Sequence, residues 1–236
     1  MTTPADTPPA TPHGTPDAPL LTVRGETTLE VDPEIARIGI TVTARGRDRR
    51  TTLDDLTRRN ATVLDLVKSY GDTVEHLATG AVSITPELTP RGRGERVRTY
   101  HGHTHVTAEL TDFTALGELT TRLADLDLTR IDGPWWALRP TSPVHRQARR
   151  QAVHEAVQRA HEYADALGTT LAALIQLTDT GTQGPHPRAA FDRRAVRMSA
   201  ATAEPDTTPE PLDLEPPRLR VQAEVSAQFT MVPPHL

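Results

Sequence analysis

Apolar and polar residues alternate near the start of the chain, which is the pattern of a half-buried β-strand. The alternation covers residues 20–32 and returns over 38–44, with Asp32 and Pro33 turning the chain between the two segments. Gly25 lies inside the first segment and suggests a bulge or bend there. The pattern therefore predicts two strands joined by a short turn.

Three later segments have the period of an α-helix. Residues 51–70 carry leucine and valine at helical spacing, and Thr52 with Asp55 resembles an N-terminal capping box. Asp112 predicts the start of a second helix. A third helix is predicted over 142–167, because a serine followed by a proline is a strong start signal.

In that third helix alanine recurs at every fourth position from 148 to 164. Such a row makes a smooth ridge that another element can approach closely. Two interpretations stay open: the ridge packs on the protein's own sheet, or it forms a subunit contact.

The remaining extended segments are 80–89, 96–110, 129–139, 171–178 and 219–231. Pro86 favours an edge position for the first of them, because proline cannot donate a ladder hydrogen bond. The predicted order is β-β-α-β-β-α-β-α-β-β. Short turns between neighbouring strands predict antiparallel sheets with helices packed on one side, an α+β fold.

Proline is concentrated in two terminal segments and one internal segment, which lie outside the body of the chain. Fifteen of the 21 prolines fall in 1–19, 181–217 and 233–236. Such segments bury too little apolar surface to offset the entropy of ordering them. We therefore predict a disordered tail at 1–19, one domain at 20–232 with a disordered loop at about 181–217, and a short tail at 233–236.

Charge and composition exclude several classes of function. The net charge is −5, and most of it lies in the tail and the loop, so the body is nearly neutral. A neutral body argues against binding to a nucleic-acid backbone. No apolar stretch is long enough to span a membrane. Absence of cysteine excludes disulfides and thiolate chemistry, and the N-terminal sequence has no secretory signal, which predicts a cytoplasmic protein.

The histidines at 101, 103 and 105 are the most suggestive group for chemistry. His101, His103 and His105 alternate along a predicted strand and therefore share one face, about 7 Å apart. Three imidazoles can hold zinc, nickel or copper. The competing interpretation is a polar outer face, since the opposite face of this strand is apolar. We carry the metal site as the alternative hypothesis.

Motifs for other chemistry are missing from the sequence. There is no Gly-x-Ser-x-Gly elbow, no phosphate-binding loop and no His-Glu-x-x-His. The glycine-rich stretch at 91–96 has no helix to aim amide groups at a phosphate, so it predicts a hairpin tip. No catalytic residue and no cofactor are predicted.

Trp135 and Trp136 are the only tryptophans, and they are adjacent. Neighbouring residues of a strand face opposite sides, so one is expected inside and the other exposed. An exposed tryptophan often marks an interface. Both are therefore candidate interface residues.

A set of motifs, taken in order, resembles the SIMPL-domain family. The segment Val23-Arg24-Gly25-Glu26 followed by 31–36 is similar to the family's N-terminal motif, with Thr27 in place of a glycine and Glu34 in place of an aspartate. Tyr100-His101-Gly102 resembles the strand after the family's hairpin. The alanine-rich helix and the final alternating strand also fit.

The resemblance implies an α+β fold and a function that is poorly defined. Bacterial relatives are often periplasmic or secreted, some assemble into larger oligomers, and members are linked to stress responses. The family carries no catalytic residues over to this chain. Our first hypothesis is a non-enzymatic protein that acts through self-association or binding of a protein partner, and the alternative is a metal-binding protein or metal-dependent enzyme.

Overall fold

A computed structural model describes residues 14–88, 97–183 and 210–235. Its elements are β1 (Leu20–Val31), β2 (Ile35–Gly46), α1 (Arg49–Lys68), the 3-10 helix η1 (Gly71–Thr73), β3 (Val74–Leu88), β4 (Val97–Leu110), α2 (Phe113–Ala124), β5 (Thr129–Ala137), α3 (Pro143–Ala166), β6 (Leu171–Gln183) and β7 (Leu219–Met231). The predicted α+β class and the order of strands and helices are confirmed. The predicted hairpin tip at 91–96 lies outside the described residues.

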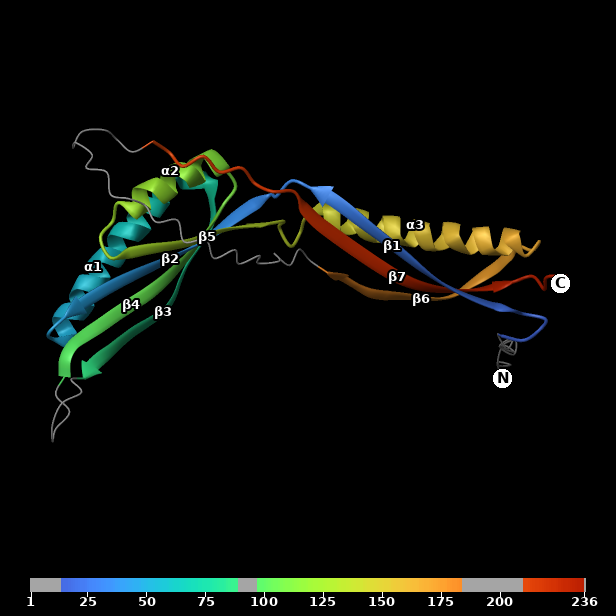
Figure 1. The fold of residues 1–236 in the computed structure, drawn as a ribbon, viewed down its shortest axis with the longest axis horizontal. Helices are drawn as coiled ribbons and strands as arrows, with labels where there is room; N and C mark the ends of the chain where they lie inside the picture. Colours follow the sequence, from blue (N-terminus) through green and yellow to red (C-terminus); the bar gives the residue numbers. More distant parts are fainter. Residues whose placement is uncertain (1–13, 89–96, 184–209, 236) are drawn as a thin grey trace, which may run out of the picture. The chain divides into compact units, whose positions relative to one another are not determined.

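The chain forms two compact units, each with its own antiparallel sheet. The three-stranded unit contains the strands in the order β1-β7-β6 together with α3 (Figure 1). The four-stranded unit contains the order β3-β4-β2-β5 together with α1 and α2 (Figure 1). Consecutive strands β1 and β2 do not pair, because β1 pairs along its whole length with β7, the last strand of the sequence.

The core of the four-stranded unit lies between its sheet and the two helices. Apolar side chains of β2 and β4 face α1 and α2, and they are almost completely buried. The buried core includes Ile38, Ile40, Val42 and Val106 of the sheet, Leu56, Val63 and Val67 of α1, and Leu116, Leu119 and Leu123 of α2. Both helices of this unit lie on the same face of its sheet (Figure 1), and no described helix of the unit covers the other face, called here the helix-free face.

In the three-stranded unit, α3 lies along one face of the sheet through its alanine row. Ala148, Ala152, Ala156, Ala160 and Ala164 are fully buried, so the ridge packs on the protein's own sheet. The register of β1 with β7 has no shift, so of the bulge or bend predicted at the glycine of β1 the bulge is absent. That glycine lies under α3, and it allows the helix backbone to approach the strand closely.

Helix α1 begins earlier than the sequence pattern suggests, and its N-cap is Asp48. The Asp48 carboxylate accepts hydrogen bonds from the backbone N–H groups of Arg50 and Thr51, at 2.9 and 3.0 Å. These bonds, that of Thr51 first, lower the pKa of Asp48. Thr52 is buried one turn into the helix, where its hydroxyl donates to the Asp48 carbonyl at 2.7 Å. The predicted capping box at Thr52 is therefore wrong.

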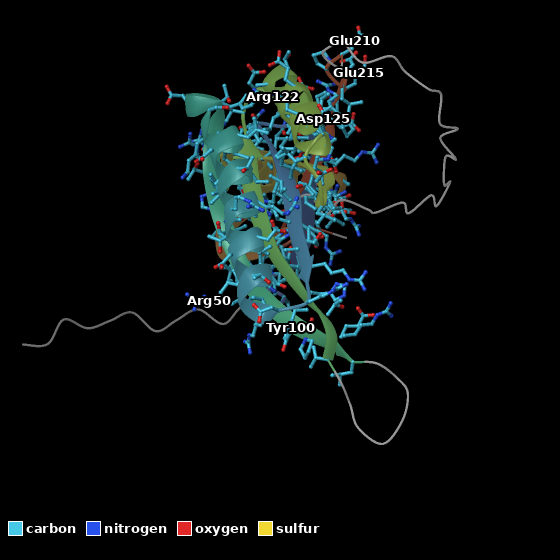
Figure 2. The ribbon with its side chains drawn as sticks, turned by 90° about the vertical axis from the view of Figure 1, so that its left-hand side faces the viewer. Arg50, Tyr100, Arg122, Asp125, Glu210 and Glu215 are labelled. Atoms are coloured by element: carbon cyan, nitrogen blue, oxygen red, sulfur yellow. The ribbon has the colours of Figure 1, made fainter. Side chains whose placement is uncertain are left out.

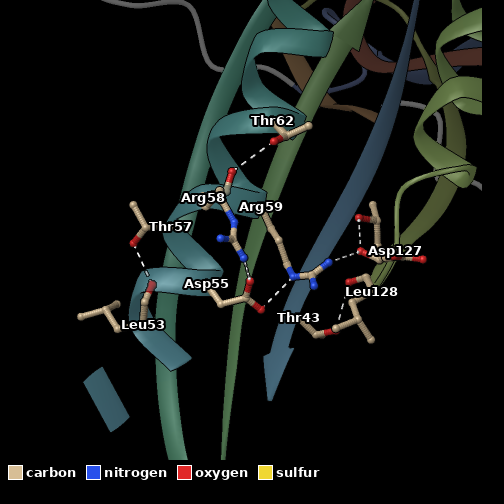
Figure 3. Close-up of polar contacts among 10 residues, drawn as sticks. Thr43, Leu53, Asp55, Thr57, Arg58, Arg59, Thr62, Asp127 and Leu128 are labelled. Carbon is tan, nitrogen blue, oxygen red and sulfur yellow. Dashed lines mark hydrogen bonds and ion pairs between the residues drawn. The ribbon is translucent and has the colours of Figure 1, made fainter. Parts of the chain in front are cut away.

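An arginine ties α1 to the turn that precedes β5. Arg59 donates to the Asp55 carboxylate at 2.9 Å and to the Asp127 carbonyl at 3.1 Å (Figure 3). The hydrogen bond from Arg59 is the main cause of the lowered pKa of Asp55. Thr43 of β2 donates from its hydroxyl to the Leu128 carbonyl at 3.0 Å in the same turn (Figure 3).

Some residues of the segments predicted as disordered belong to the described part of the chain. Residues 14–19 make a turn in which the Gly14 N–H donates to the Ala18 carbonyl at 2.9 Å. Strand β6 continues into the predicted loop, to Gln183. Leu212 lies against α2, where its backbone N–H donates to the Thr121 hydroxyl at 3.2 Å, and Leu214 packs on the core. Figure 2 shows Glu210 at the same end of the unit as Arg122. Residues 1–13 and 184–209 lie outside the described part of the chain.

Candidate functional site

The three histidines of β4 lie on the helix-free face of the four-stranded sheet. Pairing with β2 places Arg45 beside His101, Thr43 beside His103 and Thr41 beside His105. The residues between the histidines face the helices and are buried. This arrangement confirms the predicted polar outer face of the strand.

Each histidine has different surroundings. His101 Nε2 lies 2.8 Å from the Glu87 carboxylate, and His105 Nδ1 lies 3.3 Å from the Thr41 hydroxyl. Among the described residues His103 has no polar partner, and no group of three or more histidine, aspartate or glutamate side chains is placed to hold a metal ion. Alternate residues of an extended strand are about 7 Å apart, so the imidazoles are spread along β4. The predicted metal site is not supported.

Glu87 of β3 is the centre of a polar cluster that sequence reasoning missed. Its carboxylate accepts a hydrogen bond from the Thr99 hydroxyl at 2.6 Å and one from Arg45 at 2.9 Å, and His101 completes the set. The hydrogen bonds from Thr99 and His101, with the charge of Arg45, lower the pKa of Glu87 to about 2. The carboxylate is therefore ionised at neutral pH and ties β3, β4 and β2 together.

The two tryptophans take opposite sides of β5, as predicted. Trp136 packs against the core and meets Phe113 edge to face, with ring centroids 4.7 Å apart. Trp135 is 43% exposed on the helix-free face. A Cβ at Gly39 would lie 2.8 Å from the His105 ring and 3.4 Å from the Trp135 ring, so both rings lie over this glycine. An interface role for Trp135 and Trp136 stays a prediction.

Charged groups on the helix-free face are paired with one another. Arg37 pairs with Glu109 across β2 and β4, and Arg130 lies 2.7 Å from the carboxylate of Asp132. Together with the Glu87 cluster, these pairs leave the face nearly neutral. A neutral face does not favour a strongly charged ligand.

The described surface has hollows at the start of α3 and on α1. One of about 590 Å³ lies at the start of α3 and is lined by prolines 140 and 143 with Ser142, His145 and Arg149 among others. The Ser142 hydroxyl there accepts from the Val144 N–H at 3.3 Å, as the cap of α3. A second hollow of about 380 Å³ is lined by residues of the arginine–aspartate tie on α1. Both are surfaces built around structural contacts.

Taken together, the two units define an α+β scaffold whose exposed sheet faces and edges are its distinctive surfaces. The chain belongs to the SIMPL family, described as a protein of unknown function (DUF541), which matches residues 21–229. The match spans both units and confirms the resemblance seen in the sequence. Comparison with curated proteins gives no match. In the described residues no helix is long and apolar enough to cross a membrane.

Proposed function

We propose that this SIMPL protein acts by binding rather than by catalysis, and that its first binding partner is a second copy of itself. The observation that carries the proposal is the edge strand β6. Among the described residues it pairs with β7 alone, and its Leu174 and Leu177 side chains are 53% and 47% exposed. An exposed apolar edge strand is a ready site for association with another chain.

The first part of β6 lacks the residues that usually keep a free edge strand from pairing with another chain. Proteins commonly protect such strands with charged residues or proline, and residues 171–178 contain neither. Two copies of this segment can therefore meet around a two-fold axis without repulsion between like charges. Register shifts near Ala172 and Ile175 bend the strand, so we expect the exposed leucines to provide most of the contact.

The test is the assembly state of the purified chain, measured by sedimentation velocity across the micromolar range. The wild-type chain is expected to be larger than a monomer and to grow with concentration. Replacing both Leu174 and Leu177 by lysine is expected to shift it toward the monomer, since two like charges per copy would then face each other. A strictly monomeric wild-type chain would contradict the proposal.

Leu53 on α1 offers a matched control, because it is also exposed, at 43%, but lies on a helix of the other unit. The Leu53→Lys variant is expected to assemble like the wild-type chain. If it dissociated as much as the β6 variant, general surface charge rather than the edge strand would explain the result.

A further inference from the structure

The outer side of α3 carries a charge pattern that its own sheet does not explain. Since every fourth residue from 148 to 164 faces the sheet, the positions two residues further on face away from it. This outward row, with one row beside it, forms the outer side of α3. It consists of Arg146, Arg150, His154, Gln158 and Glu162, with His145, Arg149, Val153, Val157, His161 and Asp165 alongside.

Positive charge on this outer side gathers in the first half of the helix and negative charge in the second. Arg146, Arg149 and Arg150 are exposed, and none has an ion-pair partner among the described residues. Glu162 and Asp165 are exposed near the other end and also lack a cationic partner there. The ion pair of Arg159 with its i−4 glutamate belongs to the flank of the helix next to β1.

This distribution is unfavourable for a helix considered by itself. The macrodipole favours anions near the N-terminus and cations near the C-terminus, and α3 has the reverse in both halves, with no acid in its first turn and no base in its last. The three arginines also stand three and four residues apart, where like charges repel. Contacts within the described chain do not offset this electrostatic cost. A surface of complementary charge on another molecule would offset it.

A second copy of the same helix provides that surface when it runs antiparallel. The outer side is symmetric about the midpoint between residues 155 and 156: Arg149 is as far from it as Glu162, and Arg146 as far as Asp165. Antiparallel helices place such positions at the same height. Two-fold symmetry repeats each contact, so one pairing rule yields four opposite-charge contacts.

We propose that two copies of this chain associate through the outer sides of α3, antiparallel about a two-fold axis. Arg149 and Arg146 of each copy then face Glu162 and Asp165 of the other copy. The half-buried Val153 of each copy lies near the centre of this interface. A parallel arrangement would place arginine against arginine and is disfavoured. This inference rests on the proposed self-association and assigns one of its surfaces.

The test reverses charges singly and then together. Arg149→Glu and Glu162→Arg each turn two attractive contacts of the dimer into two repulsive ones. Because each single variant removes two weak attractions between exposed charges and adds two repulsions of similar size, it is expected to weaken association by about fourfold to several hundredfold. The double variant restores both contacts and is expected to associate nearly as tightly as the wild-type chain.

Rescue by the double variant can arise only between copies. Residues 149 and 162 are separated by about 20 Å along one helix at 1.5 Å per residue, well beyond the Debye length of about 8 Å at physiological salt. Arg149→Glu also agrees better with the helix macrodipole, so weaker association in that variant would not result from a destabilised helix. Helix content by circular dichroism checks this directly.

Arg47→Glu is the matched control, since Arg47 is exposed in the other unit and has no ion-pair partner among the described residues. It changes the net charge equally and is expected to leave the dissociation constant unchanged. Single variants that associate as tightly as the wild-type chain, or a double variant that stays weak, would overturn the α3 interface while leaving self-association standing. A wild-type chain that stays monomeric at low salt would overturn both.

Discussion

Gly25 of β1 gives the sharpest test of how α3 packs on its sheet. A Cβ added at this position would lie 2.1 Å from the Ala152 carbonyl oxygen and 2.5 Å from the Ala156 backbone nitrogen. Carbon atoms in contact prefer about 3.5–4.0 Å, and both atoms belong to the helix backbone, so no side-chain rotation can relieve the clash. The Gly25→Ala variant must therefore move α3 away from β1 by about 1 Å or more.

The cost of that movement can be worked out from the contacts it loosens. Insertion of a methyl group into a well-packed core typically costs about 1–3 kcal/mol. Since the shift also disturbs the fully buried alanine row of α3, we expect the upper end, about 3 kcal/mol. For a chain of this length each kcal/mol lowers Tm by about 2–4 °C, so the expected fall in Tm is about 6–12 °C.

Thermal unfolding followed by circular dichroism measures this effect. Gly80→Ala in β3 is the control, because its nearest new contact would be the His105 carbonyl oxygen at 3.3 Å. That variant is expected to stay within about 1 kcal/mol of the wild-type stability. A Gly25→Ala variant with the Tm of the wild-type chain would refute the close approach of α3 to β1.

Three further predictions concern the four-stranded unit. Gly117→Ala would place a Cβ 2.1 Å from the carbonyl oxygen of Leu212, so faster hydrogen exchange is expected over residues 210–218 and unchanged exchange would show that they do not lie on α2. Because the pKa of Glu87 is depressed to about 2, its ionised carboxylate stabilises the fold above pH 4.5, and this stabilisation is lost as the pH falls toward 2. Glu87→Gln should therefore lower Tm at neutral pH. A difference in Tm between wild type and variant that did not shrink in acid would contradict this. Trp135→Ala is expected to leave the stability nearly unchanged, while Trp136→Ala is expected to lower it by about 3 kcal/mol, the low end for a core aromatic because Trp136 is partly buried. Equal losses of stability in thermal unfolding would contradict the opposite placement of the two side chains.

Much of the fold could be predicted because apolar residues recur at regular spacing along the strands and helices. The alternation of β7 and the alanine period of α3 each identify both the element and its buried face. The edge position predicted from Pro86 is confirmed, since in the described part of the chain β3 pairs with β4 alone. These features depend on neighbouring residues, which a sequence shows directly.

The division into two sheets could not be predicted, because it depends on pairing across almost the whole chain. Leu21 pairs with Phe229, and nothing local to either residue indicates this partner. The short turn at Asp32 suggested instead that β1 and β2 pair with each other. The glycine of β1 and the alanine row were both noticed, but only the structure shows that they meet.

The Glu87 cluster was missed for a similar reason. Arg45, Glu87 and His101 come from three strands, and each alone has the pattern of an ordinary exposed residue. The histidine row drew attention because its members are close in sequence, yet the strand spreads them apart. Spatial partners from distant segments, rather than spacing within one strand, decide which groups act together here.

We propose that this SIMPL protein works by associating with copies of itself. Sedimentation velocity of the wild-type chain at low and high salt tests it most directly. We predict a species heavier than the 25.8 kDa monomer, whose mass rises with protein concentration and falls as salt screens the α3 charges. A single species of monomer mass under every condition would contradict it.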